Sequence, residues 1–560
     1  MHNMSQNKLK VLMCSEASFL NSGFGTYAKE ILSRLHKTNK YIIAEFASYG
    51  FVNDPRDKSI DWIYYANAVR DNDPRHKEYS SRPDNQFGRW RFEKVLLDFK
   101  PDIVIDVRDY WMSSYQALSP LRKFFHWILM PTVDSEPQQE DWIDTFLGAD
   151  SVFTYSDWGA DVLKKQSSGK INYIDTVSPG VDLKTFRIKE NKEEIKQKYK
   201  LPTDSIIIGS VMRNQKRKLI PELFSTFRSV LDQLEKDNDI DTAKKLYLYI
   251  HTSYPDMGWD IPELLKEHRI SNKVFFTYIC KNCKYVDSSL FNGSSKICSK
   301  CHHAISVFPS VADGLDTETL SDIYNTFDLY VQYAICEGFG MPQVEAGACG
   351  VPIATVNYSA MCDVINKLEA FAIEPQTRFK ELETKAIRVY PDNNQLKEYI
   401  LDFIKLPSKK IYKLRAQTRK LTEKYYCWDD IAKKWEKHLD YLQDIGCYGK
   451  WNLQPQFMKP LPNIDSKQNQ NLDVMLHIYQ NYLKDLVKID SMPLLNLLKD
   501  ADYGFSNVGP VQIKASNIKN LIEYAQTLIS NNNHTEDFRS KNLTIEEDFI
   551  TYAKIKASSV

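Results

Sequence analysis

One short run, residues 337–352, limits most narrowly the fold that this chain can adopt. It reads Glu-Gly-Phe-Gly-Met-Pro-Gln-Val-Glu-Ala-Gly-Ala-Cys-Gly-Val-Pro and lies between apolar runs at 329–335 and 353–356. Pro342 suits a first helical turn and Gly350 suits a helix end, so a helix of about two turns is expected between them. The run therefore predicts a strand, a glycine turn, a short helix and a second strand.

The start of this short helix is a natural seat for a phosphate group. Unpaired amides, the positive end of the helix dipole and the absence of side chains at Gly338 and Gly340 all favour an anion there. Glu337 precedes the seat, and Glu345 follows one helical turn beyond Pro342. Carboxylates would repel a phosphate, so we expect them to bind flanking hydroxyl groups, which a nucleotide sugar has on both sides. A capped helix with an acidic first turn is the purely structural alternative.

The wording of this run resembles the E-x7-E signature of retaining glycosyltransferases of the GT-B type, in particular family 4 and its group 1 relatives. The resemblance implies an α/β fold in which two Rossmann-like, doubly wound domains face each other across a cleft. It implies that Glu337 contacts the donor sugar and that Glu345 holds the ribose hydroxyls. The amides of Phe339 and Gly340, next to Met341, would support the sugar or the diphosphate.

The first half of the chain alternates apolar strands with amphipathic helices, which predicts a parallel sheet. The expected strands are 9–14, 41–47, 102–107, 124–130 and 151–155. Gly23 and Gly25 open the first helix and would let the backbone approach a ligand, although a plain tight turn is an equal interpretation. In the resembled family this loop lines the cleft.

Asp134 follows the strand at 124–130, at the carboxyl edge where open α/β sheets bind ligands, so it is a site candidate. Many members of the resembled family carry a histidine near this strand end, whereas here Val133 precedes Asp134. His126 lies within the strand and is expected to be a core residue. Residues 108–110, after the preceding strand, could line the cleft or form a solvated loop.

A second group of candidates follows the strand expected at 206–211. Residues 212–218 contain four basic side chains, and cations at the carboxyl end of a parallel strand are well placed to neutralise a diphosphate. The resembled family has an arginine at this strand end and a lysine five residues later, which correspond to Arg213 and Lys218. Residues 177–186 resemble the family's crossing from the first domain to the second.

Two Cys-x-x-Cys pairs interrupt the second half of the chain. Cys280 and Cys283 are separated by fourteen residues from Cys298 and Cys301. Four thiolates at this spacing predict a structural Zn²⁺ in a ribbon that the family resemblance does not include. A redox dithiol pair is the minor alternative. The ribbon could also bind nucleic acid or protein, but a metal clip that holds a loop without its own core is at least as good an interpretation.

Composition limits the remaining possibilities. Basic and acidic residues both number 73, so any nucleic-acid or membrane surface must be a local patch. The polar start and the lack of a long apolar run predict a cytoplasmic protein without a membrane span, and most cysteines suit a reducing compartment. The segment 82–94 mixes arginines with aromatic residues; an amphipathic helix is favoured there over an acceptor or nucleic-acid contact.

Four regions are expected from these patterns. They are an amino-terminal acceptor domain at 1–185, a nucleotide-sugar domain at 186–445, the zinc ribbon at 280–301 and a helical carboxyl-terminal extension at 446–560. The predicted function is a retaining glycosyltransferase that uses a nucleotide sugar. The acceptor stays open between a glycan, a small molecule and modified DNA, and so does the oligomeric state. The alternatives are a DNA-modifying glycosyltransferase and a non-catalytic GT-B protein whose ribbon holds nucleic acid or a protein.

Overall fold

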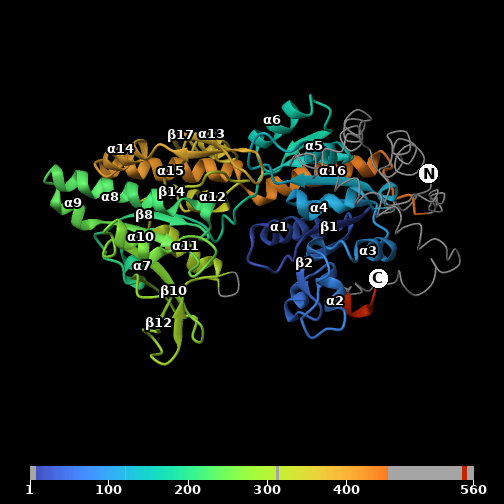
Figure 1. Ribbon diagram of the computed structural model, residues 1–560, viewed down its shortest axis with the longest axis horizontal. Helices are drawn as coiled ribbons and strands as arrows, with labels where there is room; N and C mark the ends of the chain where they lie inside the picture. The colour runs from blue at the N-terminus through green and yellow to red at the C-terminus, as the bar shows by residue number, and fades with distance from the viewer. Residues whose placement is uncertain (1–7, 120, 311–313, 452–544, 552–560) are drawn as a thin grey trace, which may run out of the picture.

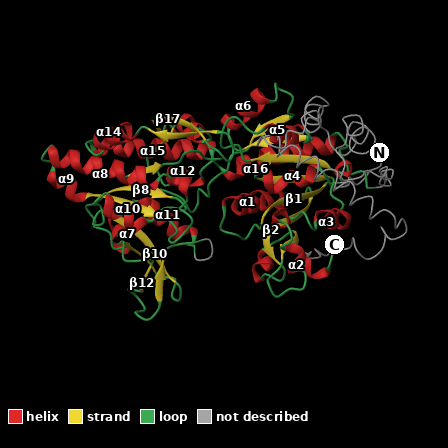
Figure 2. Ribbon diagram, in the orientation of Figure 1, coloured by secondary structure: helices red, strands yellow, loops and turns green. Residues whose placement is uncertain are grey.

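A computed structural model of the chain describes residues 8–119, 121–310, 314–451 and 545–551. Figure 1 shows two α/β lobes side by side, the amino-terminal one in blue and the second in green to orange. Figure 2 shows the strands of both lobes inside, with helices around them. The predicted fold class, two doubly wound domains of the GT-B type, is confirmed.

The first lobe is built on a sheet with the order β19-β3-β2-β1-β4-β5-β6-β7, parallel except for β19 at its edge. Its strand β1 is apolar and almost entirely buried because helices cover both of its faces. The strands are β1 (Lys10–Glu16), β2 (Ile42–Phe51), β3 (Ile63–Ala68), β4 (Ile103–Arg108), β5 (His126–Pro131), β6 (Ser151–Thr154), β7 (Tyr173–Thr176) and β19 (Ile550–Thr551). The helices are α1 (Gly23–Lys37), α2 (His76–Tyr79), α3 (Phe92–Phe99), α4 (Tyr110–Ala117), α5 (Glu140–Leu147) and α6 (Asp157–Gln166).

The second lobe repeats this plan, with parallel strands in the order β10-β9-β8-β14-β15-β16. Its strands are β8 (Ile206–Val211), β9 (Leu246–His251), β10 (Val274–Cys280), β14 (Leu329–Gln332), β15 (Ile353–Val356) and β16 (Phe371–Ile373), with a separate hairpin of β17 (Pro375–Lys380) and β18 (Ile387–Pro391). The helices are α7 (Lys192–Lys198), α8 (Ile220–Lys236), α9 (Ile240–Lys245), α10 (Ile261–Glu267), α11 (Thr317–Thr326), α12 (Met341–Ala348), α13 (Met361–Leu368), α14 (Asn393–Phe403) and α15 (Ser408–Tyr425).

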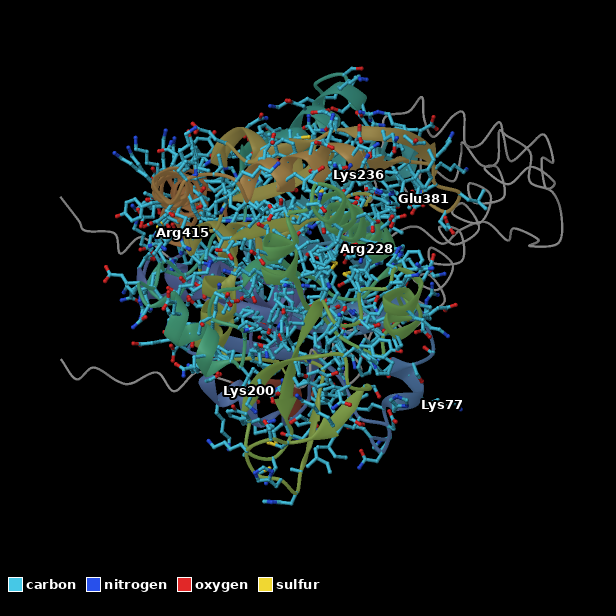
Figure 3. All side chains as sticks on the ribbon, turned by 90° about the vertical axis from the view of Figure 1, so that its left-hand side faces the viewer. Lys77, Lys200, Arg228, Lys236, Glu381 and Arg415 are labelled. Atoms are coloured by element: carbon cyan, nitrogen blue, oxygen red, sulfur yellow. The ribbon has the colours of Figure 1, made fainter. Side chains whose placement is uncertain are left out.

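The four-cysteine insertion extends β10 into an antiparallel ribbon. Strands β11 (Val286–Leu290) and β13 (Ile305–Val307) pair with β10, and β12 (Ser295–Ile297) pairs with β13. Figure 1 shows the ribbon projecting from the second lobe at β10 and β12. At its base Lys200, labelled in Figure 3, donates a hydrogen bond of 2.7 Å to Ser299. The ribbon therefore shares a strand with the second sheet.

The chain crosses between the lobes twice, and the two crossings lie side by side. The amide of Val181 donates to the carbonyl of Tyr426 over 2.9 Å, and Val181 forms a parallel bridge with Cys427. After the second crossing, α16 (Trp428–Asp444) returns to the first lobe, where Trp435 donates to the hydroxyl of Tyr27 over 2.8 Å. The predicted helical extension falls mostly on residues 452–544 and 552–560, outside the described residues.

Candidate active site

The run that anchors the sequence analysis adopts the predicted arrangement between β14 and β15. Gly340 has φ +85° and occupies the position before α12, which spans Met341 to Ala348, and Gly350 has φ +70° after its end. A Cβ on Gly338 would lie 2.3 Å from Cγ2 of Thr132, a residue that follows β5 in the first lobe. The glycine turn before α12 therefore passes directly against the other domain.

Glu337 is buried in a cationic pocket at the carboxyl edge of the second sheet. Its carboxylate pairs with the ammonium of Lys218 and accepts 2.9 Å from Arg217 and 2.8 Å from the amide of Gln332. Burial alone would raise the pKa of Glu337, but Lys218 and Arg217 outweigh it and hold the pKa at about 2. Glu337 is therefore ionised throughout the physiological pH range.

The basic cluster after β8 divides into two groups. Arg213 forms a bidentate pair with Asp256, at 2.8 and 3.0 Å, and half of its side chain is exposed at the rim. Lys218 is buried and faces Glu337, as does Arg217, whose side chain is 40% exposed. The spacing in the resembled family predicts Arg213 and Lys218 as the cations that face the diphosphate, and it does not include Arg217. The structure instead brings Arg217 and Lys218 together, apart from Arg213.

Glu345 has a quite different environment from Glu337. It lies on α12 and accepts a hydrogen bond of 2.7 Å from the hydroxyl of Tyr324 on α11. Burial raises the pKa of Glu345 to about 7, although the bond from Tyr324 lowers it. Nearby, the ring of Phe339 packs on Tyr426 at the domain crossing, with a centroid distance of 5.6 Å. Nothing in the local sequence marks Tyr324 as a site residue, because it reaches Glu345 only through the packing of α11 beside α12.

Asp134 lies at the predicted strand end and contacts the second lobe directly. It accepts 3.1 Å from Arg388 on β18 and lies 3.4 Å from the thiol of Cys336. Arg388 also pairs at 2.8 Å with Glu381, which Figure 3 labels. Asp134 is thus an interdomain contact beside the glycine turn. The sequence patterns do not predict its partner Arg388, because the two residues are far apart in the sequence.

Arg108 and Asp109, at the carboxyl end of β4, have different environments. Burial, reinforced by the carboxylate of Asp134, raises the pKa of Asp109 to about 6, while the charge of Arg217 in the other lobe lowers it. Arg108, by contrast, is wholly buried against Asp106. Asp109 and Arg217 therefore interact electrostatically across the domain boundary.

Gly23 and Gly25, both in the first turn of α1, differ in role. A Cβ on Gly25 would lie 2.7 Å from the carbonyl of Leu20, so glycine is required there by the turn. A Cβ on Gly23 would meet no atom within 4 Å, so Gly23 borders open space at the start of the helix. His126 begins β5, at the end of the strand opposite Asp134, and its Nε2 lies 2.9 Å from Ser151, as expected for a structural histidine.

The four ribbon cysteines form a cluster that could hold a metal ion. Their sulfur atoms all lie within 4.8 Å of one another, and the pairs Cys280–Cys301 and Cys283–Cys298 are each 3.7 Å apart. Four sulfurs at the Zn–S distance of about 2.3 Å in a tetrahedron would be about 3.8 Å apart, so the donor set fits. The amide of Cys283 points at the sulfur of Cys280 over 3.4 Å, and the amide of Lys300 at that of Cys298 over 3.3 Å.

Comparison with known proteins finds one matching family model and several similar folds. Residues 310–405, which contain α12 and the glycine turn, match the family model described as Glycosyl transferases group 1. Sucrose-phosphate synthase from Thermosynechococcus elongatus is 17% identical, with a TM-score of 0.57 over 79% of this chain and 100% of that one. A glycosyltransferase from Rickettsia africae is 14% identical, with a TM-score of 0.53 over 78% of this chain and 99% of the other.

A third similar structure is described as a complex with a nucleotide and a sugar. The Anabaena protein HepE, in complex with UDP and glucose, is 11% identical, with a TM-score of 0.51 over 78% of this chain and 100% of that chain.

In the described ranges, 8–119, 121–310, 314–451 and 545–551, every helix is too short or too polar to cross a bilayer.

Proposed function

We propose that this chain is a group 1 glycosyltransferase with the GT-B fold, that it uses a nucleotide-sugar donor and that it transfers the sugar with retention of anomeric configuration. The observation that carries the proposal is the buried group of Glu337, Lys218 and Arg217 beside the open start of α12. A site that merely stabilised the fold would have no use for two cations and a helix start facing a cleft. This favours an enzyme over the non-catalytic alternative.

The donor diphosphate is proposed to lie between the start of α12 and the cations of Arg217 and Lys218. Arg217 is the cation best placed to reach it, because its side chain is 40% exposed while one amino group donates to Glu337. The buried Lys218 adds a second positive charge, and the half-exposed Arg213 adds a third. As the diphosphate leaves, its negative charge grows, so fixed cations stabilise the transition state more than the ground state.

The sugar and the ribose are proposed to lie on either side of this diphosphate. Glu337 stays ionised and so can accept hydrogen bonds from the hydroxyls of the donor sugar. Glu345, one turn into α12, is assigned to the ribose hydroxyls, with the backbone at Phe339, Gly340 and Met341 lining the seat between them. UDP-glucose is the first donor to test, because the similar HepE structure was described with UDP and glucose.

In the transfer step, the bond between the sugar C1 and the phosphate oxygen breaks and a bond from C1 to the acceptor oxygen forms on the same face. The acceptor hydroxyl gives its proton to the departing phosphate oxygen, so no protein nucleophile is assigned. Two interdomain contacts hold the lobes together around the reacting groups and exclude water. They join Gly338 to Thr132 and Asp134 to Arg388.

The acceptor is proposed to bind against the first lobe, where carboxylates predominate. Glu16 ends β1, Asp109 follows β4 and Asp134 follows β5, and these three strands are neighbours in the sheet. Asp134 already has a counter-charge in Arg388, whereas a neutral molecule rich in hydroxyls could donate hydrogen bonds to the carboxylates of Glu16 and Asp109. We therefore propose a neutral sugar or polyol in preference to a phosphorylated acceptor or modified DNA.

The metal of the four-cysteine cluster is proposed to be a structural Zn²⁺, since all four tetrahedral positions are filled by protein. It takes no part in transfer. None of the ten cysteines, all within the described residues, forms a disulfide, and we propose a reducing, cytoplasmic environment.

The proposal is tested by offering neutral sugars, sugar phosphates and duplex DNA with hydroxymethylated bases as acceptors, together with UDP-glucose. Proton NMR of the product reports its anomeric configuration. An α-linked product on a neutral acceptor is expected. A β-linked product would overturn retention, and preferential transfer to a sugar phosphate or to the DNA would overturn the assignment of a neutral acceptor.

A further inference from the structure

The basic and aromatic segment at 82–94 contacts the chain's own carboxyl-terminal segment. Residues 545–551 lie against the first lobe, and Ile550 and Thr551 form β19, antiparallel to β3 in register with Tyr65 and Tyr64. Figure 1 shows this segment in red beside α2, on the side of the lobe away from the second domain. The edge of the first sheet is thereby covered by a distant part of the sequence.

Charge pairing fixes the segment at two points. Arg75 makes a bidentate pair with Asp548, at 2.9 and 2.7 Å, and Arg91 donates to the carboxylate of Glu546. Arg91 is only 1% exposed, and Glu546 supplies a counter-charge to its buried guanidinium. Burial would raise the pKa of Glu546, but the hydrogen bond from Arg91 lowers it to about 2.

An aromatic anchor lies between the two ion pairs. Phe549 is 1% exposed, and the guanidinium carbons of Arg91 and Arg75 lie 3.3 and 4.5 Å from its ring centroid. The ring of Trp90 meets Phe549 edge-on at 5.9 Å. Two arginines around one buried ring, combined with strand addition, are features of peptide recognition rather than of simple edge protection.

We propose that Arg75, Trp90, Arg91 and the edge of β3 form a peptide-binding socket whose ligand is an acidic segment with a phenylalanine anchor, filled in this chain by residues 545–551. The segment acts as a releasable clasp in cis. This inference is independent of the donor, the acceptor and the metal.

The chain also contacts the first lobe well before the clasp, at residues 449–451. Just before residue 452, Gly449 donates 2.7 Å to Asp102 and Trp451 donates 2.8 Å to the carbonyl of Pro101, both in the first lobe. The described residues on either side of 452–544 therefore both lie against the first lobe.

The test uses the full chain with Asp548→Arg and Phe549→Ala, which empties the socket, and a fluorescent peptide of residues 543–553. We expect the peptide to bind the emptied chain at least about 20-fold more tightly than the intact chain, whose own segment competes at high effective concentration. A peptide carrying Asp548→Arg should bind about 20-fold more weakly, and adding Arg75→Asp to the emptied chain should restore its binding.

Equal binding to intact and emptied chains, no binding to an emptied chain with a native circular dichroism spectrum, or no rescue by the charge swap would overturn the proposal. Hydrogen exchange on the unaltered chain serves if the emptied chain does not fold: amides at 549–551 should exchange more slowly than in Arg75→Asp. Equal exchange rates would contradict the clasp. Concentration-dependent dimers of the intact chain, cross-linked through this segment, would show binding in trans and contradict its action in cis.

Discussion

Lys218 and Glu337 form a buried ion pair at the carboxyl edge of the second sheet, although they are 119 positions apart in the chain. Arg217 approaches the same carboxylate from the more exposed side. The pair explains how two cations can be kept ready for a diphosphate without leaving either charge unpaired in a buried site.

Replacing Glu337 with glutamine tests this pairing. Glu337→Gln keeps the shape of the side chain but leaves Lys218 and Arg217 without a counter-charge. We expect kcat/KM for the donor to fall at least about 100-fold and the free energy of unfolding to fall by about 3 kcal/mol. Steady-state rates and urea unfolding measure the two effects.

Asp232→Asn is the matched control, because it removes the carboxylate of an exposed pair with Arg228 on α8. It should leave both quantities within error of the wild type. Wild-type rates in Glu337→Gln would refute its assignment to the donor sugar.

Glu345 gives donor binding a dependence on pH. The pKa of Glu345 is raised from 4.5 to about 7, and its ionised form is the better acceptor of ribose hydrogen bonds. Donor affinity should therefore rise as the pH increases through about 7. Stability should move the other way: the folded state keeps a proton that the unfolded state loses above pH 4.5, so stability declines between about pH 4.5 and 7.

Glu345→Gln separates these two effects. The amide cannot ionise, so donor affinity should be lower at pH 8 and independent of pH near 7. Its stability relative to the wild type should be greater at pH 8 than at pH 5. Calorimetric donor titrations and thermal unfolding at both pH values measure this, and an unchanged affinity profile would argue against contact between Glu345 and the ribose.

Tyr324 tunes the same carboxyl group through its 2.7 Å hydrogen bond. Tyr324→Phe removes a contact that lowers the pKa of Glu345, so the midpoint of the affinity profile should shift to higher pH. Donor affinity measured from pH 6 to 9 would report the shift. A midpoint at the wild-type pH would mean that the bond contributes nothing to the ionisation of Glu345.

Much of this site follows from the sequence because its signals are local. The glycine turn, Pro342 and the two glutamates lie within one strand, turn and helix, so their geometry depends on nearby backbone rules. Arg217 was missed because family spacing favoured Arg213, which in the structure faces Asp256. Nothing local distinguishes an arginine at the rim from one above a buried carboxylate.

Contacts between distant segments were beyond the sequence patterns. Arg388 lies on a two-stranded hairpin whose position against Asp134 depends on how the domains close. Residues 82–94 were expected to form an amphipathic helix, but α3 starts only at Phe92, and Trp90 and Arg91 before it receive Phe549. Strand β3, which pairs with β19 of that segment, is not among the strands predicted from the sequence.

The pair of Asp134 and Arg388 should control closure of the domains. Asp134→Asn removes one charge of this 3.1 Å contact, and we expect the turnover number for transfer to fall about tenfold, with a larger share of donor lost to water. Product and free sugar measured in the same reaction give that ratio. A double-mutant cycle with Arg388→Met should show coupling of at least about 0.5 kcal/mol, and strictly additive effects would rule out a direct role of the pair.

Removing the ribbon metal should destabilise the second domain without changing the chemistry. The purified chain should contain one Zn²⁺ per molecule, and Cys298→Ser should lower both the metal content and the melting temperature, because the ribbon shares β10 with the sheet. Cys362→Ser, at a free thiol on α13, is the control. Full occupancy by zinc in Cys298→Ser, or loss of activity in molecules that remain folded, would contradict a purely structural site.

Release of nucleoside diphosphate from a panel of nucleotide sugars, without acceptor, tests the central claim most directly. The wild type is compared with Lys218→Met and with Glu345→Ala. Slow release from one donor, abolished in both variants, is the predicted result and would identify the donor. Absence of release and of thermal stabilisation with every donor in the panel would contradict the account of this cleft as a nucleotide-sugar site.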